Sequence, residues 1–582
     1  MKTGLWILHG ITALIFGALL ELNHSRWIGW ILFVAAVVLF PLLAGKWKTA
    51  GKHALLYFGS ILLYVLIILF AWPRPEAVPA VAVKNPDVTG TVAVEHGMLT
   101  GVFNRDHSVE VYAGIPYAKA PVGELRWKKP QEEDDWDGIL ACDHFAPMSM
   151  QTTSLPIVDS LTQIIGYHDY HPFTSHSVAP VSEDSLYLNI WKPAGEQRNL
   201  PVIVYIHGGS LKTGQPWFQD YNGESLAKKG AIVVNMGYRL GVFGFLAEDE
   251  FLKEEGTTGN YGLLDQIKAL QWVQKNITAF GGDPGNVTIS GESAGSVCVD
   301  ALCVSPLAEG LFGKAILESS TVSSVKPPHS YRLFDEALFS GKDLMARYGC
   351  ASASELRNLP AEKIVGELDS QHHITIDGYV LPDTPHNLRA GGVHNESAIL
   401  HGFNKEESGP FILFDQADLK DYESKVRAVF GEAADDVLKA YPASTDAEAK
   451  AQWALIYGAK YFNYSHYCLN RLAVGQNEPV YEYFFTKSNG RISSWHSGEL
   501  PYAYGNLPAG SSLFQKSDYD LSEYMQNCWI NFAVSGDPNA PGSSEFAQNT
   551  DSTKLMELGD HIGMIDEPFL KLYEILDRYE GE

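Results

Sequence analysis

Basic residues are scarce in this sequence of 582 residues. Lysine and arginine together number 43, against 69 aspartate and glutamate, which gives a net charge of −26 at pH 7. A protein that neutralises nucleic-acid phosphates needs a face rich in lysine and arginine. The composition therefore argues against nucleic acid as a partner, and the excess of acid indicates a solvated acidic surface.

Cysteine is also sparse, and the six that occur form no metal-binding motif. No two of them stand in a C-x-x-C pair, and no group of cysteine and histidine has the spacing of a zinc site. A location outside the cytoplasm would allow disulfides, but buried free thiols are the expected state for most of the six. They are Cys142, Cys298, Cys303, Cys350, Cys468 and Cys528.

Charged residues are nearly absent from the first 73 positions, which hold three long apolar runs at 5–20, 27–44 and 54–72. A membrane-spanning helix needs about 20 mostly apolar residues, with about 17–25 as the working range. The second and third runs meet this length, whereas the first is shorter and carries His9. Residues 1–73 are therefore predicted to be a membrane anchor, and whether the first run spans is left open.

The loop between the second and third runs predicts how this anchor is oriented. Residues 45–53 contain three lysines, and short basic loops stay on the cytoplasmic side of a membrane. The third run then leads outward, so the rest of this multi-pass membrane protein is expected outside the cytoplasm. The second and third runs contain no acid or base that would mark a transport pathway, which favours an anchor over a transporter.

A proline-rich stretch separates the anchor from the rest of the chain. Pro73, Pro75 and Pro79 are spaced as in a stiff, extended linker, which we place at 74–87. The domain that follows is expected to cover residues 88–582.

Within this domain, strand-like apolar runs alternate with helical periodicity. The strand-like runs are 201–206, 231–235 and 286–290, and the helical stretches are 263–276 and the residues that follow Gly295 through Val304. Such alternation predicts an α/β protein whose central sheet is mostly parallel and covered by helices on both faces. Residues 92–111 differ, because their turn residues around 104–106 predict an antiparallel hairpin.

Residues 291–295 read Gly-Glu-Ser-Ala-Gly and lie between a strand-like run and a helical one. In that context, G-x-S-x-G holds a serine on a tight turn with its hydroxyl exposed. The hydroxyl of Ser293 is a poor nucleophile by itself, so the motif requires a histidine base, an orienting acid and donors for an oxyanion. The alternative is a glycine-flanked turn that merely needs small residues. Glu292, beside the serine, is expected to add charge near the site or to be structural.

A second glycine-rich turn supplies candidate oxyanion donors. Residues 207–210 read His-Gly-Gly-Ser and directly follow the strand-like run that ends at Ile206. Backbone N–H groups in such a turn point toward one spot, and the N–H after the nucleophile adds another. Gly209, Ser210 and Ala294 are therefore the predicted oxyanion hole.

Ordered motifs across residues 92–545 resemble the type B carboxylesterase family, which includes bacterial para-nitrobenzyl esterases and the cholinesterases. The resemblance implies an α/β-hydrolase fold and hydrolysis of carboxylic esters. Acids within these motifs, such as Glu183, Asp184 and Asp265, are expected to hold loops and helix ends. The matching motifs, besides those around the serine and the glycine-rich turn, are 114–118, 182–191, 238–241, 262–266 and 280–284.

Two further motifs match the family's acid and histidine loops. Residues 402–408 resemble the acid loop, in which Glu407 matches the catalytic acid and its neighbour Glu406 is the competitor. Residues 495–501 resemble the histidine loop, so His496 is the expected base. The order serine, acid, histidine is the one that α/β-hydrolases use.

The resemblance also implies a mechanism. Ser293 attacks an ester carbonyl, His496 takes its proton, and Glu407 orients the imidazole. This chemistry needs no metal and no cofactor. Another acid, Asp377, is expected to be structural.

The sequence departs from the family pattern at three places, and each departure predicts a property of the site or of a nearby loop. Ser210 replaces the third glycine of the oxyanion turn, which narrows the pocket and disfavours bulky alcohols, tertiary ones especially. Ser149 and Ser185 stand where the family's first disulfide has cysteines, so the loop 149–185 must be held in another way and is expected to be mobile. The choline-binding tryptophan has no counterpart around 175–177, so choline esters are not expected.

The resulting hypothesis is a membrane-anchored serine esterase that faces outward and acts on small to medium carboxylic esters. Its expected partners are a small-molecule ester and the lipid bilayer, the latter through residues 1–73. One alternative is a non-catalytic surface adhesion module of the same fold, although such modules typically lack a member of the triad. Another is an esterase that acts on membrane lipid esters.

Overall fold

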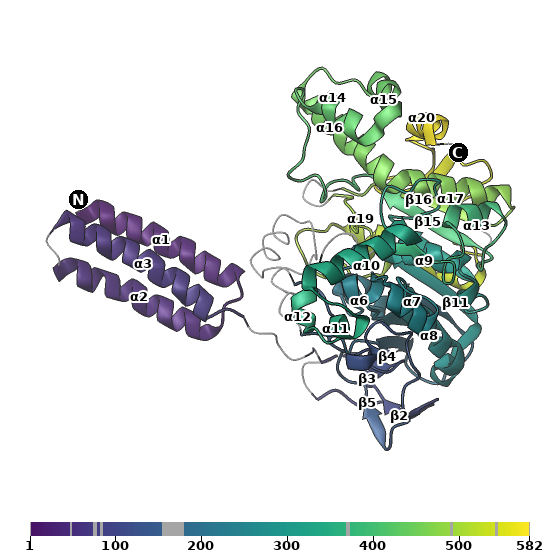
Figure 1. Cartoon of the computed structure of the whole chain (residues 1–582), viewed down its shortest axis with the longest axis horizontal. Helices are drawn as coiled ribbons and strands as arrows, with labels where there is room; N and C mark the ends of the chain where they lie inside the picture. Colours follow the sequence, from purple (N-terminus) through teal and green to yellow (C-terminus); the bar gives the residue numbers. More distant parts are fainter. Residues whose placement is uncertain are drawn as a thin grey trace. The chain divides into compact units, whose positions relative to one another are not determined.

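The computed structural model describes residues 2–46, 49–73, 78, 80–81, 85–153, 180–367, 373–488, 493–541 and 545–580 (Figure 1). The chain forms two compact units. The first comprises Met1–Ala77 and Thr153–Pro180, and the second comprises Val78–Thr152 and Val181–Glu582.

The first unit contains three helices, α1 (Lys2–Leu22), α2 (Trp27–Lys46) and α3 (Ala50–Phe70), which pack against one another. Each has 20 or 21 residues and is therefore about 30 Å long, close to the hydrocarbon thickness of a bilayer. All three are long and apolar enough to cross a membrane by length and composition. The first apolar run, residues 5–20, is short for a span, but it lies within α1, which extends beyond the run at both ends.

The outward-facing side chains of this unit are largely apolar. Leu14, Trp27 and Leu55 are 77%, 73% and 69% exposed, and they lie on three different helices. The interior is a small cluster around Phe33 and Tyr64. Helices that are apolar on the outside as well as the inside have no polar face to turn toward water.

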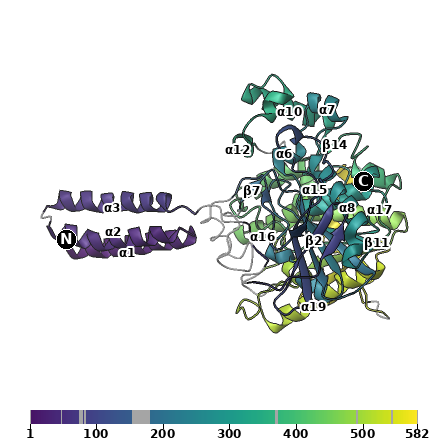
Figure 2. The same ribbon diagram turned by 90° about the horizontal axis from the view of Figure 1, so that it is seen from below.

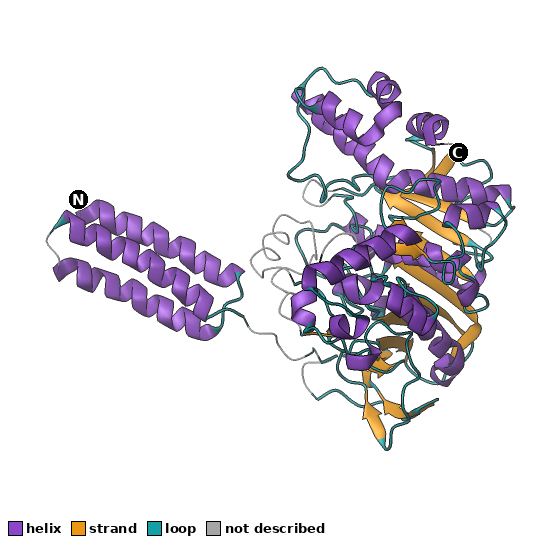
Figure 3. Cartoon of the chain, viewed as in Figure 1, coloured by secondary structure: helices purple, strands orange, loops and turns teal. Residues whose placement is uncertain are grey.

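An eleven-stranded sheet forms the centre of the second unit (Figure 3). Neighbouring strands run parallel from β17 to β10, and the outer strands are antiparallel, which confirms the predicted mostly parallel sheet. The order across the sheet is β18 (Ile562–Asp566), β17 (Lys554–Leu558), β16 (Val480–Phe485), β15 (Ile399–Asn404), β12 (Lys314–Glu318), β11 (Gly282–Glu292), β9 (Leu200–Ile206), β10 (Ile232–Met236), β8 (Tyr187–Pro193), β4 (Val109–Pro116) and β3 (Val102–Phe103).

The central strands are buried on both faces, as their continuous apolar sequences predict. All residues of β10, and all of β9 after Leu200, are buried. Helix α9 (Ala294–Val304) packs against β9, β11 and β12 and also contacts α8 (Tyr261–Asn276). Helix α19 (Lys516–Ser535) contacts β9 and β11 and lies across the sheet from α10 (Phe334–Tyr348) (Figure 2).

Shorter elements complete the second unit among the described residues. The strands are β1 (Val92–Val94), β2 (Gly97–Thr100), β5 (Ile139–Ala141), β6 (Met148–Ser149), β7 (Val181–Ser182), β13 (Tyr331–Leu333) and β14 (Ile374–Ile376). The helices are α5 (Glu224–Lys228), α6 (Gly241–Phe245), α7 (Asp249–Glu255), α11 (Ala353–Arg357), α12 (Ala361–Ile364), α13 (Pro385–Ala390), α14 (Tyr422–Phe430), α15 (Ala434–Ala440), α16 (Asp446–Gly458), α17 (Tyr464–Gly475), α18 (Leu500–Ala503) and α20 (Leu570–Glu580).

The single hairpin predicted for residues 92–111 is two hairpins. The first pairs β1 with β2 in a separate three-stranded sheet, and the second pairs β3 with β4 at the edge of the main sheet. The chain passes between the sheets at Gly101, where a Cβ atom would clash with the carbonyl oxygen of Val111. The predicted turn after Asn104 is present in the second hairpin, closed by the N–H of Asn104 donating to Val109.

The structure shows the state of the six cysteines and the contacts of Ser149 and Ser185, which stand where the family has cysteines. All six cysteines are free, and all but the half-buried Cys350 are buried. The hydroxyl oxygens of Ser149 and Ser185 lie 2.9 Å apart in a hydrogen bond, and Ser149 also donates to the carbonyl oxygen of Tyr238. Residues 154–179, which make up most of the loop 149–185 predicted to be mobile and include positions 175–177, lie outside the described part of the chain.

Candidate active site

Ser293 stands on a sharp turn between β11, which ends at Glu292, and α9, which begins at Ala294. Its backbone has φ 56° and ψ −125°, an unfavourable conformation for a residue with a side chain. A Cβ on Gly291 would lie 2.5 Å from the backbone carbon of Gly295, and one on Gly295 would clash with strand β9. Both glycines of G-x-S-x-G are therefore required by close packing, and the predicted strand–turn–helix context is present.

His496 is hydrogen-bonded to Glu407 through its Nδ1 atom, which lies 2.6 Å from Oε2 of the carboxylate. The loops carrying these residues follow β16 and β15, two adjacent parallel strands whose carboxyl ends meet at one edge of the sheet. The other oxygen of Glu407 accepts the N–H of Asn404 at 2.7 Å. Both side chains are buried, so water does not compete for the pair.

The competing acid, Glu406, points elsewhere. Its side chain is exposed, and its carboxylate accepts the hydroxyl of Ser493 at 2.5 Å. The geometry therefore pairs His496 with the second acid of the loop, Glu407.

Glu292 connects the serine turn to the histidine. Its Oε1 lies 3.4 Å from Nε2 of His496 and accepts the hydroxyl of Ser497 at 2.6 Å. Nε2 itself is buried and has no hydrogen-bond partner among the described residues. Because Glu292 immediately precedes Ser293, these contacts bring the serine motif and the unpartnered nitrogen into one neighbourhood.

The histidine lies in a cluster of buried acids that shapes its proton affinity. Burial alone lowers the pKa of His496, but the carboxylates of Glu292 and Glu407 outweigh burial and raise the pKa to about 9. Burial also raises the pKa of Glu292, raises that of Glu499 to about 8, and raises that of Glu318 well above its usual range.

Sequence reasoning missed two members of this cluster. Glu499 accepts from Ser319 at 3.1 Å and also bonds Asn404, while Glu318 accepts the indole N–H of Trp529 at 2.7 Å. Glu499 lies inside the predicted histidine loop, but nothing in the sequence signals that a glutamate there is fully buried.

The glycine-rich turn after β9 lies against the serine. A Cβ on Gly208 would lie 3.1 Å from the Cβ of Ser293 and 2.7 Å from the carbonyl oxygen of Glu292. Gly209 and Ser210 both have positive φ, 107° and 57°. The turn therefore sits beside the N-terminus of α9, where the helix dipole favours negative charge.

Two phenylalanines cover the histidine ring. Phe411 meets it edge-on with ring centroids 5.1 Å apart, and the ring centroid of Phe462 lies 4.8 Å away. An apolar cover strengthens the electrostatic interactions beneath it, because it excludes water. Neither residue was singled out in the sequence.

The acids expected to be structural have structural partners. Asp265 forms a buried ion pair with Arg239 at 2.7 Å, and Glu183 pairs with Arg126. Asp184 accepts the Tyr187 hydroxyl at 2.8 Å.

Asp377 is structural as well. Its Oδ1 accepts three successive backbone N–H groups, those of residues 379–381, and its Oδ2 accepts the hydroxyl of Thr257. Asp377 thus holds a turn.

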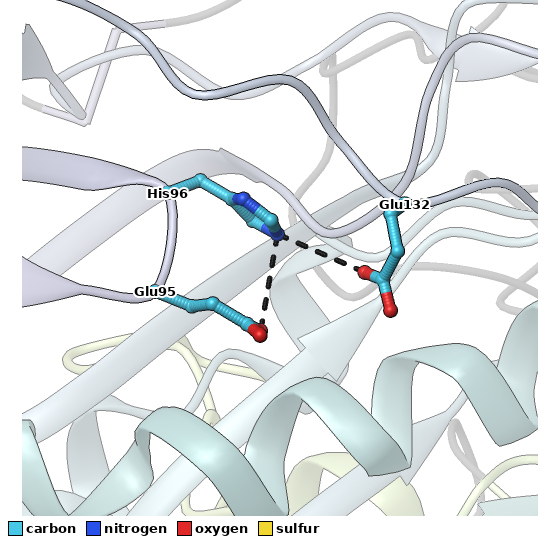
Figure 4. Close-up of side chains that lie close together, drawn as sticks. All are labelled: Glu95, His96 and Glu132. Carbon is cyan, nitrogen blue, oxygen red and sulfur yellow. Dashed lines mark ion pairs between the residues drawn. The ribbon is translucent and has the colours of Figure 1, made fainter.

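Two groups of side chains in the described part of the chain have an arrangement that suits a metal ion, and neither includes Ser293, Glu407 or His496. One is Glu95, His96 and Glu132 (Figure 4), and the other is His394, Glu396 and Glu478.

The sheet and the three loops at its carboxyl edge define an α/β-hydrolase. Residues 88–571 match the model of the carboxylesterase family. The chain is 32% identical to a fumonisin B1 esterase of Sphingopyxis macrogoltabida over 514 residues, covering 84% of this chain and 89% of that protein. It is 30% identical to a para-nitrobenzyl esterase of Bacillus subtilis over 515 residues, covering 84% and 99%.

Similarity extends to a vertebrate enzyme and to a solved structure. A cholinesterase of Mus musculus is 32% identical over 480 residues, which cover 74% of this chain and 76% of the relative. The crystal structure of a carboxylesterase from Geobacillus stearothermophilus matches with a TM-score of 0.70 and 30% identity, covering 84% of this chain and all of the other. The chain belongs to the carboxylesterase family and is a carboxylic ester hydrolase.

Proposed function

We propose that this protein is a serine carboxylesterase that works through an acyl-enzyme intermediate. Ser293 attacks the ester carbonyl while His496 accepts its proton at Nε2, and Glu407 holds the imidazole and stabilises its charged form. His496 then protonates the leaving alcohol. Water, activated by the same histidine, releases the acid and restores the serine.

Backbone N–H groups of Gly209, Ser210 and Ala294 stabilise the oxyanion in this scheme. Such a donor contributes about 2.7–4 kcal/mol to transition-state stabilisation. Support comes from the close approach of the 208–210 turn to Ser293 and from the position of Ala294 at the start of α9.

One observation carries the proposal: His496 is bound to Glu407 through Nδ1, while its buried Nε2 has no hydrogen-bond partner among the described residues and lies 3.4 Å from Oε1 of Glu292. A buried polar atom normally has a hydrogen-bond partner, and an exception needs an explanation. A nitrogen that must accept the proton of Ser293 during reaction supplies one.

Small to medium carboxylic esters are the proposed substrates. The relatives are named for different substrates, among them fumonisin B1 and para-nitrobenzyl esters, so family membership specifies the ester bond rather than the groups on either side of it. The side chain of Ser210 in the oxyanion turn favours esters of unhindered alcohols.

We further propose that residues 1–73 anchor the protein in a membrane, with 74–87 as linker and 88–582 as the esterase domain outside the cytoplasm. Three helices of spanning length with apolar outer faces support the anchor. Lysines at 46, 48 and 52 support a cytoplasmic loop between α2 and α3, and with three spans the domain that follows α3 is outside.

Protease treatment of intact spheroplasts tests this topology. The full-length protein should fractionate with membranes and lose its esterase domain to added protease, while a cytoplasmic marker enzyme stays intact. A domain that is digested only after the spheroplasts are lysed would contradict the orientation.

The adhesion-module and lipid-ester alternatives have their own tests. A fluorophosphonate probe should label Ser293, whereas a non-catalytic module should not react. Lipid esters as substrates would require that removal of residues 1–73 lowers hydrolysis of long-chain esters in vesicles while short-chain hydrolysis stays unchanged.

A further inference from the structure

Asn404 lies where the loops of Glu407 and His496 meet. It is completely buried at the end of β15, three positions before Glu407. Its backbone N–H donates to Oε1 of Glu407 at 2.7 Å. Its side-chain Nδ2 donates to the carbonyl oxygen of Trp495 at 2.8 Å, and Trp495 is the residue before His496. One residue therefore contacts the acid directly and the histidine loop through its amide.

The amide of Asn404 makes a second hydrogen bond, to Oε2 of the buried Glu499. The other carboxylate oxygen of Glu499 accepts the hydroxyl of Ser319 at 3.1 Å. Both groups that face Nδ2 are acceptors, so the nitrogen of the amide, and not its oxygen, must point toward them. Oδ1 is buried and has no hydrogen-bond partner among the described residues. The side chain is thus used for its two N–H donors, and neither an aspartate nor a leucine at this position could supply both.

The two loops are also joined through their backbones. The N–H of Glu406 donates to the carbonyl oxygen of Ser494 at 2.9 Å, and Glu406 forms a parallel β-bridge with Trp495. These contacts involve no side chain, so they remain when Asn404 is replaced. Loss of the amide would therefore release the Trp495 carbonyl, next to His496, without separating the loops.

We propose that Asn404 is a positioning residue for ester hydrolysis: its amide fixes His496 against Glu407 by holding the Trp495 carbonyl, and it holds Glu499 beside the imidazole. This role rests on the proposed serine mechanism. A displacement of about 1 Å in a reacting group can lower the rate by about 10²-fold, even when the replaced residue lies away from the chemistry. Asn404 acts in this way, through the groups that it holds.

Glu499 connects Asn404 to the charge of the histidine. Burial and two neighbouring carboxylates raise the pKa of Glu499 to about 8, and the hydrogen bond from Asn404 acts in the opposite direction. Burial lowers the pKa of His496, but the carboxylates around it, Glu499 among them, outweigh burial and raise the pKa to about 9. Glu499 is therefore ionised in the pH range in which His496 loses its proton, and its charge favours the protonated imidazole.

Replacing Asn404 by leucine should lower the pKa of His496. Without the amide, the pKa of Glu499 rises further, so this carboxyl group is neutral over more of the range in which His496 titrates. A neutral Glu499 does not stabilise the imidazolium, so the neutral base persists to lower pH. The acid limb of the kcat/KM profile should therefore move toward lower pH, by up to about one unit.

The other ionisable groups that act on Glu499 or His496 come from several elements. They are Glu292 at the end of β11, Glu318 at the end of β12, Glu407 after β15, Tyr483 on β16, Tyr504 after α18, and His329. Burial raises the pKa of both tyrosines well above the usual range and lowers that of His329 to about 4, so these three are neutral where His496 titrates. Asn404→Leu leaves all of these groups in place, so a shift of the acid limb reports the bond to Glu499.

Turnover per active site of the full-length protein tests the proposal. A fluorophosphonate counts the sites with a reactive Ser293, which separates loss of folded protein from slow chemistry. In Asn404→Leu, kcat per labelled site for para-nitrophenyl acetate should fall by about 10–100-fold, with KM within about twofold and the acid limb at lower pH. Asn404→Asp has nearly the same shape but can donate at most one hydrogen bond here, so it should also lower kcat. It keeps the test usable if Asn404→Leu does not fold.

Asn470→Leu is the matched control. Asn470 is also completely buried, and its Nδ2 also donates to a buried glutamate, Glu482. Glu482 lies three residues before the end of β16 and not on the loops of Glu407 and His496. The control should lower the thermal unfolding midpoint, because a buried carboxylate loses a donor, and it should leave kcat per labelled site within about twofold.

A second background isolates the electrostatic effect. In Glu499→Gln the carboxylate charge is absent, so adding Asn404→Leu should leave the acid limb in place while still lowering kcat. Three results would overturn the proposal: kcat per site in Asn404→Leu within twofold of the unmodified protein, equal losses in Asn404→Leu and Asn470→Leu, or an acid limb that moves equally in both backgrounds. Failure of the serine mechanism itself would be seen separately, as absence of labelling at Ser293 in the unmodified protein.

Discussion

Nδ1 of His496 lies 2.6 Å from Oε2 of Glu407, although the two residues are 89 positions apart in the chain. An ionised carboxylate accepts but does not donate, so in the neutral imidazole the contact places the proton on Nδ1 and leaves Nε2 as the acceptor. Glu407 thus selects the tautomer of His496 that the proposed mechanism requires.

Replacing this acid should disable the base without unfolding the protein. Glu407→Gln keeps the shape but its amide NH₂ favours the wrong tautomer, and we expect kcat to fall by roughly 10³–10⁴-fold for para-nitrophenyl acetate. Glu406→Gln is the matched control, because that side chain is exposed and bonds Ser493. It should keep activity within about twofold. Equal losses in the two variants would argue against the pairing.

Glu292 should control the pH at which the histidine becomes active. The base works in its neutral form, and the carboxylates of Glu292 and Glu407 raise the pKa of His496 to about 9. Glu292→Gln removes one negative charge, so protonated His496 is stabilised less and its pKa falls. The acid limb of the kcat/KM profile should then shift toward lower pH, on the order of one unit. A limb that stays in place or moves upward would show that Glu292 is not charged next to the imidazole.

The oxyanion turn should restrict the alcohol side of the ester. Ser210 has φ 57°, a conformation that glycine adopts at lower cost, and it is an exposed residue with a side chain that glycine would lack. Ser210→Gly should therefore raise hydrolysis of tert-butyl esters relative to ethyl esters while retaining the backbone donor. The measurement is the ratio of kcat/KM for the two esters. An unchanged ratio would place the restriction elsewhere in the pocket.

The hydrogen bond between Ser149 and Ser185 should be replaceable by a disulfide. Their hydroxyl oxygens lie 2.9 Å apart in a buried setting, where β6 and β7 run side by side. Ser149→Cys combined with Ser185→Cys should oxidise to a disulfide and stabilise the folded state by about 2–4 kcal/mol. Thermal unfolding with and without reductant measures the effect, and each single variant is a control. No loss of titratable thiols on oxidation would mean that the side chains do not meet as described.

The parallel sheet and the serine turn were predictable because both depend on local patterns. Apolar β-branched runs such as 201–206 favour strands buried on both faces, and glycines flanking Ser293 indicate a tight turn. The small sheet at the start was not predictable, because the same alternating pattern fits one hairpin or two. Which sheet a strand joins there depends on the close approach at Gly101, a contact between residues that no local pattern records.

Pairing between distant loops was predictable only through the family resemblance. Nothing local distinguishes Glu407 from Glu406, and the structure separates them by burial and by hydrogen-bond partner. The buried acids Glu318 and Glu499 escaped sequence reasoning for the opposite reason. A charged residue is expected to be exposed unless a sequence motif indicates burial. A glutamate becomes fully buried when several elements pack around it, and no local sequence pattern records such packing.

The central claim is that Ser293 is the nucleophile, and hydrolysis by its alanine variant tests it most directly. Ser293→Ala in the 88–582 fragment should lower kcat/KM for para-nitrophenyl acetate to near background, while circular dichroism and the unfolding midpoint stay close to those of the unmodified fragment. Turnover that is unchanged in a folded Ser293→Ala variant would contradict the assignment.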